Sequence, residues 1–333
     1  LHTLFPYTTL FRSDDPIRNV SSFATDHMVT CTWNVNSGWA TPELKPYGPF
    51  SIMPTASVLH YATECFEGLK AYRGYDGKLR LFRPDCNARR LLMSSARIAL
   101  PTFDTAEVEK LITELVAVDG AKFLPKSDPG KFLYLRPTMI GTQAELGVQT
   151  PKEAMLFIIA TYMPELSETP GGMKLLASQN DTVRAWPGGF GFAKVGANYG
   201  PSLMAQQEAR RLGYNQVLWL LGDEAQVTEA GASNFFTLMR SKEGKLQLIT
   251  APLGDKVILD GVTRRSVIQL VKERLSDSKD LEPLEVVERQ YTMSEIIAAS
   301  EEGRLIECFA CGTAVSFTFP LSSPRMYEPE SDY

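Results

Sequence analysis

One stretch of the chain combines residue types that could carry out covalent chemistry. Residues 186–201 read WPGGFGFAKVGANYGP, in which Lys194 is the only charged residue among five glycines and four aromatic residues. Glycine allows a bulky planar group to approach the backbone closely. Burial among apolar rings lowers the pKa of a lysine, and a lysine that is partly neutral near pH 7 can form a Schiff base with a carbonyl compound. The alternative is a solvated lysine on a surface loop.

A second candidate is Glu229, which lies in the apolar segment Gln226–Ala230. The alternation and β-branched residues of this segment predict a strand. A buried carboxylate is costly unless it has a cationic partner. Glu229 therefore either faces a cation in the interior or lies at the surface where the strand ends.

These two segments resemble one enzyme family. Residues 194–201 (KVGANYGP) and 227–231 (VTEAG) resemble the branched-chain amino acid aminotransferases, which are pyridoxal-phosphate (PLP) enzymes of fold type IV, and the resemblance runs in order from about Asp26 to about Ala314. It implies an α/β (α+β) architecture with a small N-terminal α/β domain and a larger C-terminal pseudo-barrel domain. It also implies a homodimer that transfers the amino group between leucine, isoleucine or valine and 2-oxoglutarate.

The resemblance assigns residues to the cofactor but none to a metal. Lys194 would hold PLP as a Schiff base and then act as general base and acid, and Glu229 would pair with the protonated pyridine nitrogen. Arginine suits phosphate because its planar fork is always charged, and a helix N-terminus offers free amide donors. The family positions for the phosphate are Arg90, Val262, Thr263 and Thr313, and those for the ring are Tyr199 and Leu259. For Arg90 the alternative is a solvated arginine, as we expect for its neighbour Arg89.

The resemblance also places residues at the substrate: Tyr61, Phe66, Tyr134, Arg136 and Ala314. Tyr134 and Arg136 share one face of the predicted strand 131–136, because residues two apart in a strand project to the same side. In the family this face reaches toward the pocket of the neighbouring subunit. Tyr61 and Phe66 could instead be core aromatic residues, which is the commoner fate of such side chains.

Length and composition limit the class of protein. The 333 residues favour two domains, and the net charge of −5 disfavours nucleic acid as a partner. No apolar run is long enough to cross a bilayer. The five cysteines, an odd number, favour an intracellular, reducing compartment. The sequence leaves the choice between mitochondrion and cytosol open.

Shifts in composition predict the domain boundaries. Residues 1–13 resemble the translation of a sequencing adapter and are set aside as an artefact. We expect a first domain over residues 14–163, a linker rich in proline, glutamate and glycine over 164–172, and a PLP-binding domain over 173–316. Residues 317–333 are atypical of the family and are predicted to form a disordered tail because proline, serine and glutamate are abundant there.

Local patterns predict the elements that would hold the site. A helix is expected to pass through Leu91 and Ile98, and Asp104 is typical of the cap of the next helix. Residues 39–54 are rich in proline and glycine and are expected to be a loop. Strand 131–136 is expected to end at Pro137, and a helix is expected to begin after Pro201 and to stop at Gly213.

Some positions depart from the family pattern. Ala232 stands where mammalian members carry a threonine, and Val315 and Thr318 stand where those members carry a redox-active cysteine pair. Cys308 and Cys311 lie upstream in an alternating strand pattern, which predicts buried thiols.

Two other interpretations of function stay open at the level of sequence. A D-amino acid transaminase or an aminodeoxychorismate lyase would share Lys194 and Glu229, although the block Ser57–Gly68 favours the branched-chain interpretation. A PLP-binding relative without catalytic activity would act only as an interaction module.

Overall fold

The computed structural model describes residues 23–163, 172–276, 281–313 and 316–319. The contacts between Cα atoms divide the chain into two compact units: unit 1, Leu1–Leu166 with Lys194–Gly196, and unit 2, Ser167–Ala193 with Ala197–Tyr333. The predictions for residues 1–13, 164–171 and 320–333 lie outside the described residues.

Unit 1 is built on one antiparallel sheet with the order β2-β1-β8-β7-β5-β6, in which β3 also pairs with β1 and β4 with β7. The central strands β7 and β8 are rich in buried apolar residues. This is expected of strands that have neighbours on both sides. The strands are β1 (His27–Asn34), β2 (Gly38–Trp39), β3 (Glu43–Pro46), β4 (Glu64–Phe66), β5 (Leu69–Arg73), β6 (Leu79–Leu81), β7 (Phe132–Gly141) and β8 (Glu153–Thr161).

Two predictions for unit 1 are wrong. The expected loop 39–54 contains β3, which pairs with β1 from His27↔Pro46 to Thr30↔Glu43. The expected stop at Pro137 does not occur, because β7 continues to Gly141. Pro137 lies where the neighbour of β7 changes from β5 to β4, and its carbonyl accepts a hydrogen bond from the Glu67 amide at 2.7 Å. A missing amide donor is tolerated at such an irregular point of a sheet.

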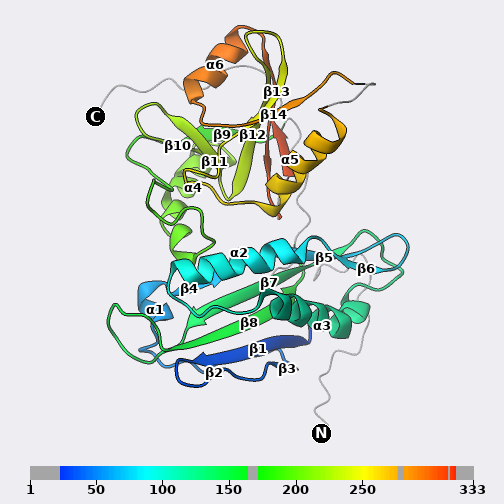
Figure 1. Ribbon diagram of the computed structural model, residues 1–333, viewed down its shortest axis with the longest axis vertical. Helices are drawn as coiled ribbons and strands as arrows, with labels where there is room; N and C mark the ends of the chain where they lie inside the picture. Colours follow the sequence, from blue (N-terminus) through cyan, green and yellow to red (C-terminus); the bar gives the residue numbers. More distant parts are fainter. Residues whose placement is uncertain (1–22, 164–171, 277–280, 314–315, 320–333) are drawn as a thin grey trace. The chain divides into compact units, whose positions relative to one another are not determined.

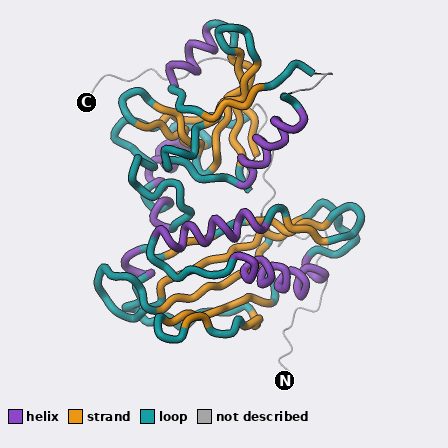
Figure 2. The backbone as a smooth tube through the Cα atoms, viewed as in Figure 1, coloured by secondary structure: helices purple, strands orange, loops and turns teal. Residues whose placement is uncertain are grey.

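Three helices complete unit 1: α1 (Val58–Tyr61), α2 (Pro84–Arg97) and α3 (Thr105–Phe123). Helix α2 begins with a proline, whose missing amide is not needed in the first turn. Helix α3 is capped by Asp104, whose carboxylate accepts the Ala106 amide at 2.9 Å, as predicted. Helices α2 and α3 pack against each other and against the sheet (Figures 1 and 2). Helix α2 thereby acquires a buried face that carries Arg90 and Ser94.

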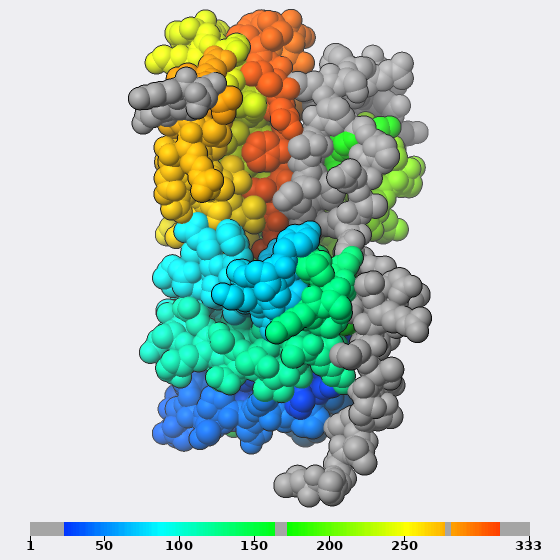
Figure 3. Space-filling model, turned by 90° about the vertical axis from the view of Figure 1, so that its right-hand side faces the viewer, coloured from blue at the N-terminus to red at the C-terminus, as the bar shows by residue number. Residues whose placement is uncertain are grey.

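The pairing of β5 with β7 continues into the residues that precede β7. The Gly130 amide donates to the Arg73 carbonyl at 2.7 Å, and the Arg73 amide donates to the Lys131 carbonyl at 2.9 Å. Figure 3 shows the β5–β6 hairpin in light blue beside green residues of this segment.

Among the helices of the described residues, each one is too short or too polar to span a lipid bilayer.

Unit 2 is built on a second sheet, with the order β14-β13-β12-β11-β10-β9 and with β15 paired to both β12 and β16. The β9–β10 and β13–β14 pairs are parallel, and the other pairs are antiparallel. The strands are β9 (Leu175–Ala177), β10 (Gln216–Leu221), β11 (Gln226–Ala230), β12 (Ser233–Arg240), β13 (Leu246–Thr250), β14 (Glu285–Glu288), β15 (Leu305–Cys311) and β16 (Ser316–Phe319).

Helices α4 (Ser202–Arg211), α5 (Val262–Arg274) and α6 (Met293–Glu301) belong to unit 2. Pro201 precedes α4, as predicted, and Thr292 caps α6 by accepting the Glu295 amide at 3.3 Å. Strand β16 pairs with β15 from Cys308↔Phe319 to Cys311↔Ser316, so the predicted disordered tail is wrong for residues 317–319. The alternation of phenylalanine with threonine there favours a strand.

Candidate functional site

The backbone of Lys194 is fixed within unit 1. Its amide donates to Oγ of Ser94 on α2 at 2.8 Å, and its carbonyl accepts the Phe66 amide at 3.0 Å. The next residue, Val195, forms an antiparallel bridge with Cys65. The segment Lys194–Gly196 therefore extends the sheet of unit 1 beside β4, and the lysine begins from a defined position.

The amine of Lys194 lies in a partly buried environment rather than in solvent. Its Nζ atom is 5.0 Å from the centre of the Phe66 ring. The pKa of this amine is lowered to about 8, first by burial and then by the guanidinium of Arg90, while Glu67 acts in the opposite direction. A measurable fraction of the amine is therefore neutral near pH 7, which is the condition for nucleophilic and proton-transfer chemistry. The prediction of a perturbed lysine is supported, and the solvated alternative is not.

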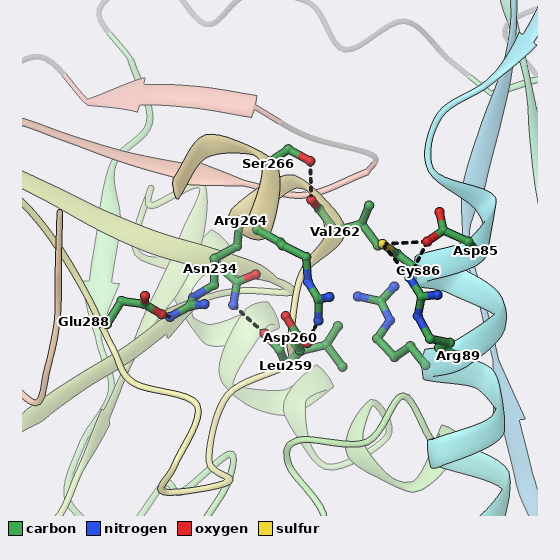
Figure 4. A network of polar contacts seen from close by, with 12 residues as sticks. Asp85, Cys86, Arg89, Asn234, Leu259, Asp260, Val262, Arg264, Ser266 and Glu288 are labelled. Atoms are coloured by element: carbon green, nitrogen blue, oxygen red, sulfur yellow. Dashed lines mark hydrogen bonds and ion pairs between the residues drawn. The ribbon is translucent and has the colours of Figure 1, made fainter. Parts of the chain in front are cut away.

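Arg90 is buried on α2, and its partner is a residue that the sequence prediction missed. Its Nε donates to Oε1 of Glu67 at 2.7 Å and its Nη2 donates to Oε2 at 2.8 Å. The exposed fractions of the two side chains are 7% and 1%. Arg90 is thus not a solvated arginine. In contrast, the neighbouring Arg89 is exposed and pairs with Asp85 on the same helix, as expected (Figure 4).

Three of the predicted substrate residues, Phe66, Tyr134 and Arg136, lie together in one cluster. The Tyr134 hydroxyl is 3.1 Å from Nη2 of Arg136, which donates to it, and the Arg136 guanidinium is 4.6 Å from the centre of the Phe66 ring. A Cβ atom on Gly68 would lie 1.9 Å from the Tyr134 hydroxyl, so only glycine leaves room for it. The buried Nε of Arg136 has no hydrogen-bond partner among the described residues. This cluster can receive an anionic or hydrogen-bonding group.

The other two predicted substrate residues are not brought into this cluster. Tyr61 ends α1, is 36% exposed, and accepts the amide of Gly147 at 2.8 Å through its hydroxyl. Ala314 lies outside the described residues.

In unit 2, Glu229 is buried on β11 and has the cationic partner that its burial requires. Nη2 of Arg184 is 2.7 Å from Oε2 of Glu229, and the exposed fractions of the two side chains are 11% and 2%. Oε1 of Glu229 accepts Nδ2 of Asn234 at 3.0 Å and the Leu259 amide at 3.1 Å. The carboxylate is therefore held in one orientation by three elements of unit 2.

Asn234 joins this carboxylate to the loop that precedes α5. Its Nδ2 also donates to the Leu259 carbonyl at 2.8 Å (Figure 4). A Cβ atom on Gly261 would lie 2.0 Å from Oδ1 of Asn234, which requires glycine at the residue before the helix. Val262 and Thr263 then open α5, whose N-terminus carries no side-chain cap. Their amides have the geometry that suits a phosphate group.

Farther along α5, Arg264 is buried and ties the helix to the sheet. Its Nη2 donates to the Ala251 carbonyl at 2.8 Å and to Oε2 of Glu288 at 2.9 Å, and Figure 4 shows both side chains. This contact fixes the N-terminal turn of the helix relative to β14.

Glu229 lines a small pocket in unit 2. Tyr199 and Leu259, the two residues predicted to contact a planar ring, line the same pocket. Thr313 lies beyond β15 and is half-buried. The fixed carboxylate on the lining of the pocket can face a group whose nitrogen carries a proton. The full lining of the pocket is Arg184, Asn198, Tyr199, Ser202, Gln206, Glu229, Gly231, Ala232 and Leu259.

Sequence reasoning missed the counter-ions. Glu67 stands in the apolar block Cys65–Ala71, and an acidic residue in such a block is the same signal that identified Glu229. Arg184 stands in a polar segment ahead of the glycine-rich stretch, where no local pattern indicates that its partner is 45 residues away.

Comparisons with known proteins agree with the resemblance. The profile of the family described as amino-transferase class IV matches residues 64–319. A mitochondrial branched-chain-amino-acid aminotransferase of Schizosaccharomyces pombe is 46% identical over 291 residues, which cover 87% of this chain and 66% of that protein. A cytosolic one of Saccharomyces cerevisiae is also 46% identical over 291 residues, covering 87% of this chain and 76% of that protein. The chain thus spans about two thirds to three quarters of these relatives.

Solved structures show the same architecture. A branched-chain aminotransferase from Thermoproteus uzoniensis with norvaline superposes with a TM-score of 0.66 and 25% identity, covering 87% of this chain and 86% of that chain. One from Thermobaculum terrenum in its PLP form superposes with a TM-score of 0.66 and 25% identity, covering 89% and 85%. The expected fold class is confirmed.

Proposed function

Because this chain belongs to the class IV aminotransferases, we propose that it transfers the amino group between leucine, isoleucine or valine and 2-oxoglutarate through PLP. The observation that carries the proposal is the Lys194 amine, which is fixed through its backbone and has a pKa lowered to about 8. The branched-chain substrates are those in the names of the relatives.

The residues of this chain fit the cofactor of the family. Unit 1 supplies an amine of lowered pKa. Unit 2 supplies a buried carboxylate at a cavity, a tyrosine and a leucine on its lining, and a helix N-terminus without a side-chain cap. PLP provides an electron sink for the electrons released when a bond at the α-carbon of the substrate breaks.

We assign the proton transfers to Lys194. With a pKa of about 8, the amine exists in both protonation states near neutral pH, so it can take a proton from the substrate α-carbon and return one. The segment that carries it is held by Ser94 and Phe66, which limits the positions that its side chain can reach.

We assign the remaining cofactor contacts residue by residue. Glu229 would accept the proton-bearing ring nitrogen, Tyr199 would hydrogen-bond the ring oxygen, and Leu259 would contact the ring face. For Glu229 the support is its fixed orientation, and for the other two it is their place in the cavity lining. The phosphate ligands would be Arg90, Val262, Thr263 and Thr313.

The substrate residues are proposed on the same basis. Phe66 offers an apolar ring, while Tyr134 and Arg136 offer a hydroxyl and a cation that suit a carboxylate. Tyr61 and Ala314 complete the proposed set. We further propose a homodimer, to be tested by light scattering, and a mitochondrial or cytosolic location, which are the locations named for the relatives.

A donor comparison tests this function. The purified full chain, loaded with PLP, is supplied with 2-oxoglutarate and with leucine, D-alanine or aminodeoxychorismate in turn, and glutamate and pyruvate are measured. We expect leucine to be the preferred amino donor by at least tenfold in kcat/KM. Preference for D-alanine would indicate a D-amino acid transaminase, pyruvate from aminodeoxychorismate would indicate the lyase, and PLP binding without turnover would indicate an inactive relative.

A further inference from the structure

Glu67 is a buried acid near the reactive lysine: it directly follows Phe66, whose amide donates to the Lys194 carbonyl at 3.0 Å. It lies in the turn between β4 and β5, directly after Phe66, and its residue surface is fully buried. A buried carboxylate is retained only where donors and cations compensate its lost hydration. The donors and cations around Glu67 therefore show which groups its carboxylate holds in position.

Donors surround the Glu67 carboxylate. Besides the two bonds from Arg90, its Oε2 accepts Nδ2 of Asn87 at 2.8 Å and the Gly68 amide at 3.2 Å. Together these donors occupy both oxygens of the Glu67 carboxylate. The forked contact also fixes the plane of the Arg90 guanidinium.

We propose that Glu67 is a positioning residue for Lys194: it fixes Arg90 and cancels the positive charge of Arg90 beside the amine. The inference deepens the proposed function, because it rests on Lys194 being the lysine that binds the cofactor. Arg90 without Glu67 would place an uncompensated cation beside a second cation. With Glu67 present, the charges of Glu67 and Arg90 offset each other, and burial remains the main cause of the lowered pKa of the Lys194 amine.

The groups that face Lys194 support this balance of charge. Arg90 and Arg136 disfavour the protonated amine, whereas Glu67 and Tyr134 favour it. Glu64 on β4 faces Arg136, which lowers its pKa, although burial raises it more. Arg90 and Arg136 are therefore each matched by a group of opposite effect, and Glu67 is the one that contacts Arg90.

The test measures the titration of Lys194 in the purified full chain after removal of bound PLP. Acetic anhydride labels neutral amines, and mass spectrometry of the Lys194 peptide gives the labelling rate from pH 6 to pH 10. In Glu67→Gln we expect the midpoint of this profile to fall by about one pH unit, because Arg90 is no longer neutralised. A midpoint at or above that of the wild type would overturn the inference.

Two further variants keep the test decisive if Glu67→Gln does not fold. Arg90→Met removes the cation and should raise the midpoint above that of the wild type. Arg90→Met/Glu67→Gln removes both charges and should bring the midpoint back to within about 0.3 units of the wild type, because the pair is replaced by neutral groups. If the double variant instead has the same midpoint as Arg90→Met, Glu67 has no charge effect on Lys194 and the inference is wrong.

An internal control is available in every sample. Lys70 on β5 is also partly buried, its pKa is lowered by burial, and its Nζ lies 4.0 Å from the centre of the Phe132 ring. Its profile should stay unchanged in all variants, which excludes a general loosening of the fold. The donor comparison with the wild-type enzyme tests the proposed function separately, so an enzyme inactive with leucine can still show the Lys194 shifts.

Discussion

Two buried arginine–glutamate pairs, one in each unit, make an informative comparison. In unit 1 the pair is Arg90 with Glu67, and in unit 2 it is Arg184 with Glu229. The family resemblance singled out the arginine of the first pair and the glutamate of the second. In each case the resemblance omitted the counter-ion. The counter-ion offsets the desolvation free energy that burial of the other charge costs.

The two pairs also differ in what lies beside them. The pair in unit 1 lies near the Lys194 amine, so the net charge of the pair influences the pKa of that amine. The pair in unit 2 lies at a cavity, and its carboxylate is fixed by Asn234 and the Leu259 amide. The first arrangement suits proton transfer, and the second suits holding a charged ring in place.

The largest effect is expected at the amine. In Lys194→Ala, kcat for transamination of leucine should fall by roughly 10³-fold or more, since the proposed proton carrier is removed. Coupled assay of glutamate formation measures it. The control is Lys110→Ala, which removes an exposed lysine on α3 that pairs with Glu107. Retention of more than a tenth of the wild-type kcat would show that the chemistry does not depend on Lys194.

The second effect is on stability in unit 2. Arg184→Met removes the cation that pairs with a carboxylate of which only 2% is exposed, and we expect the free energy of unfolding to fall by about 3–5 kcal/mol. Urea unfolding followed by circular dichroism measures it.

The matched control is Arg240→Met. Arg240 forms a forked pair with Glu282, but the exposed fractions of these side chains are 41% and 47%. Its loss should lower the free energy of unfolding far less than the loss of Arg184, because solvent screens an exposed pair. Equal losses in the two variants would mean that the Arg184–Glu229 pair behaves like a surface pair.

Sequence reasoning succeeded where the interactions join residues close together in the chain, and it failed where they join distant ones. The cap at Asp104 and the strands β11 and β15 follow from local patterns, and all three were predicted. Strand β14, Glu285–Glu288, was missed, because two valines between glutamates form no alternating pattern and the strand exists only through parallel pairing with β13.

The same limit applied to the site. The glycine-rich stretch and Glu229 were identified because their residue types are unusual for their surroundings. The contact of Glu67 with Arg90 spans 23 residues, and that of Arg184 with Glu229 spans 45. Pro137 was misjudged for the same reason, since only the change of neighbour from β5 to β4 makes it tolerable within β7.

A third effect concerns pH and again isolates unit 1. The pKa of Lys194 is lowered from 10.5 to about 8 in the folded protein. Below pH 8 the lysine is protonated in both states and opposes folding, and as pH rises from 8 toward 10.5 the unfolded chain binds the extra proton, so this cost disappears. In the PLP-free protein, Lys194→Met should therefore be more stable than the wild type at pH 7 by up to about 3 kcal/mol, and less so at higher pH.

Urea unfolding at pH 7, 8, 9 and 10 gives this difference directly. The control is Lys110→Met, whose difference from the wild type should be small and should not shrink over this range, because Lys110 is exposed. A constant difference for Lys194→Met would show that the amine is not desolvated in the folded state.

The smallest effect is expected at the thiols of unit 2, where burial acts in the opposite direction. Burial lowers the pKa of an amine and yields the neutral nucleophile, but it raises the pKa of a thiol and removes the reactive thiolate. Burial raises the pKa of Cys308 to about 11 and that of Cys311 to about 12. The two residues are also three apart in β15, so they project to opposite faces with Cα atoms roughly 10 Å apart, too far for a disulfide. Peroxide treatment should therefore change the activity of the wild-type enzyme with leucine by less than about twofold. The double variant Cys308→Ser/Cys311→Ser should respond to peroxide in the same way. A loss of activity that dithiothreitol reverses in the wild type, but that is absent in the double variant, would show that unit 2 carries a reactive group of its own and would remove the contrast with unit 1.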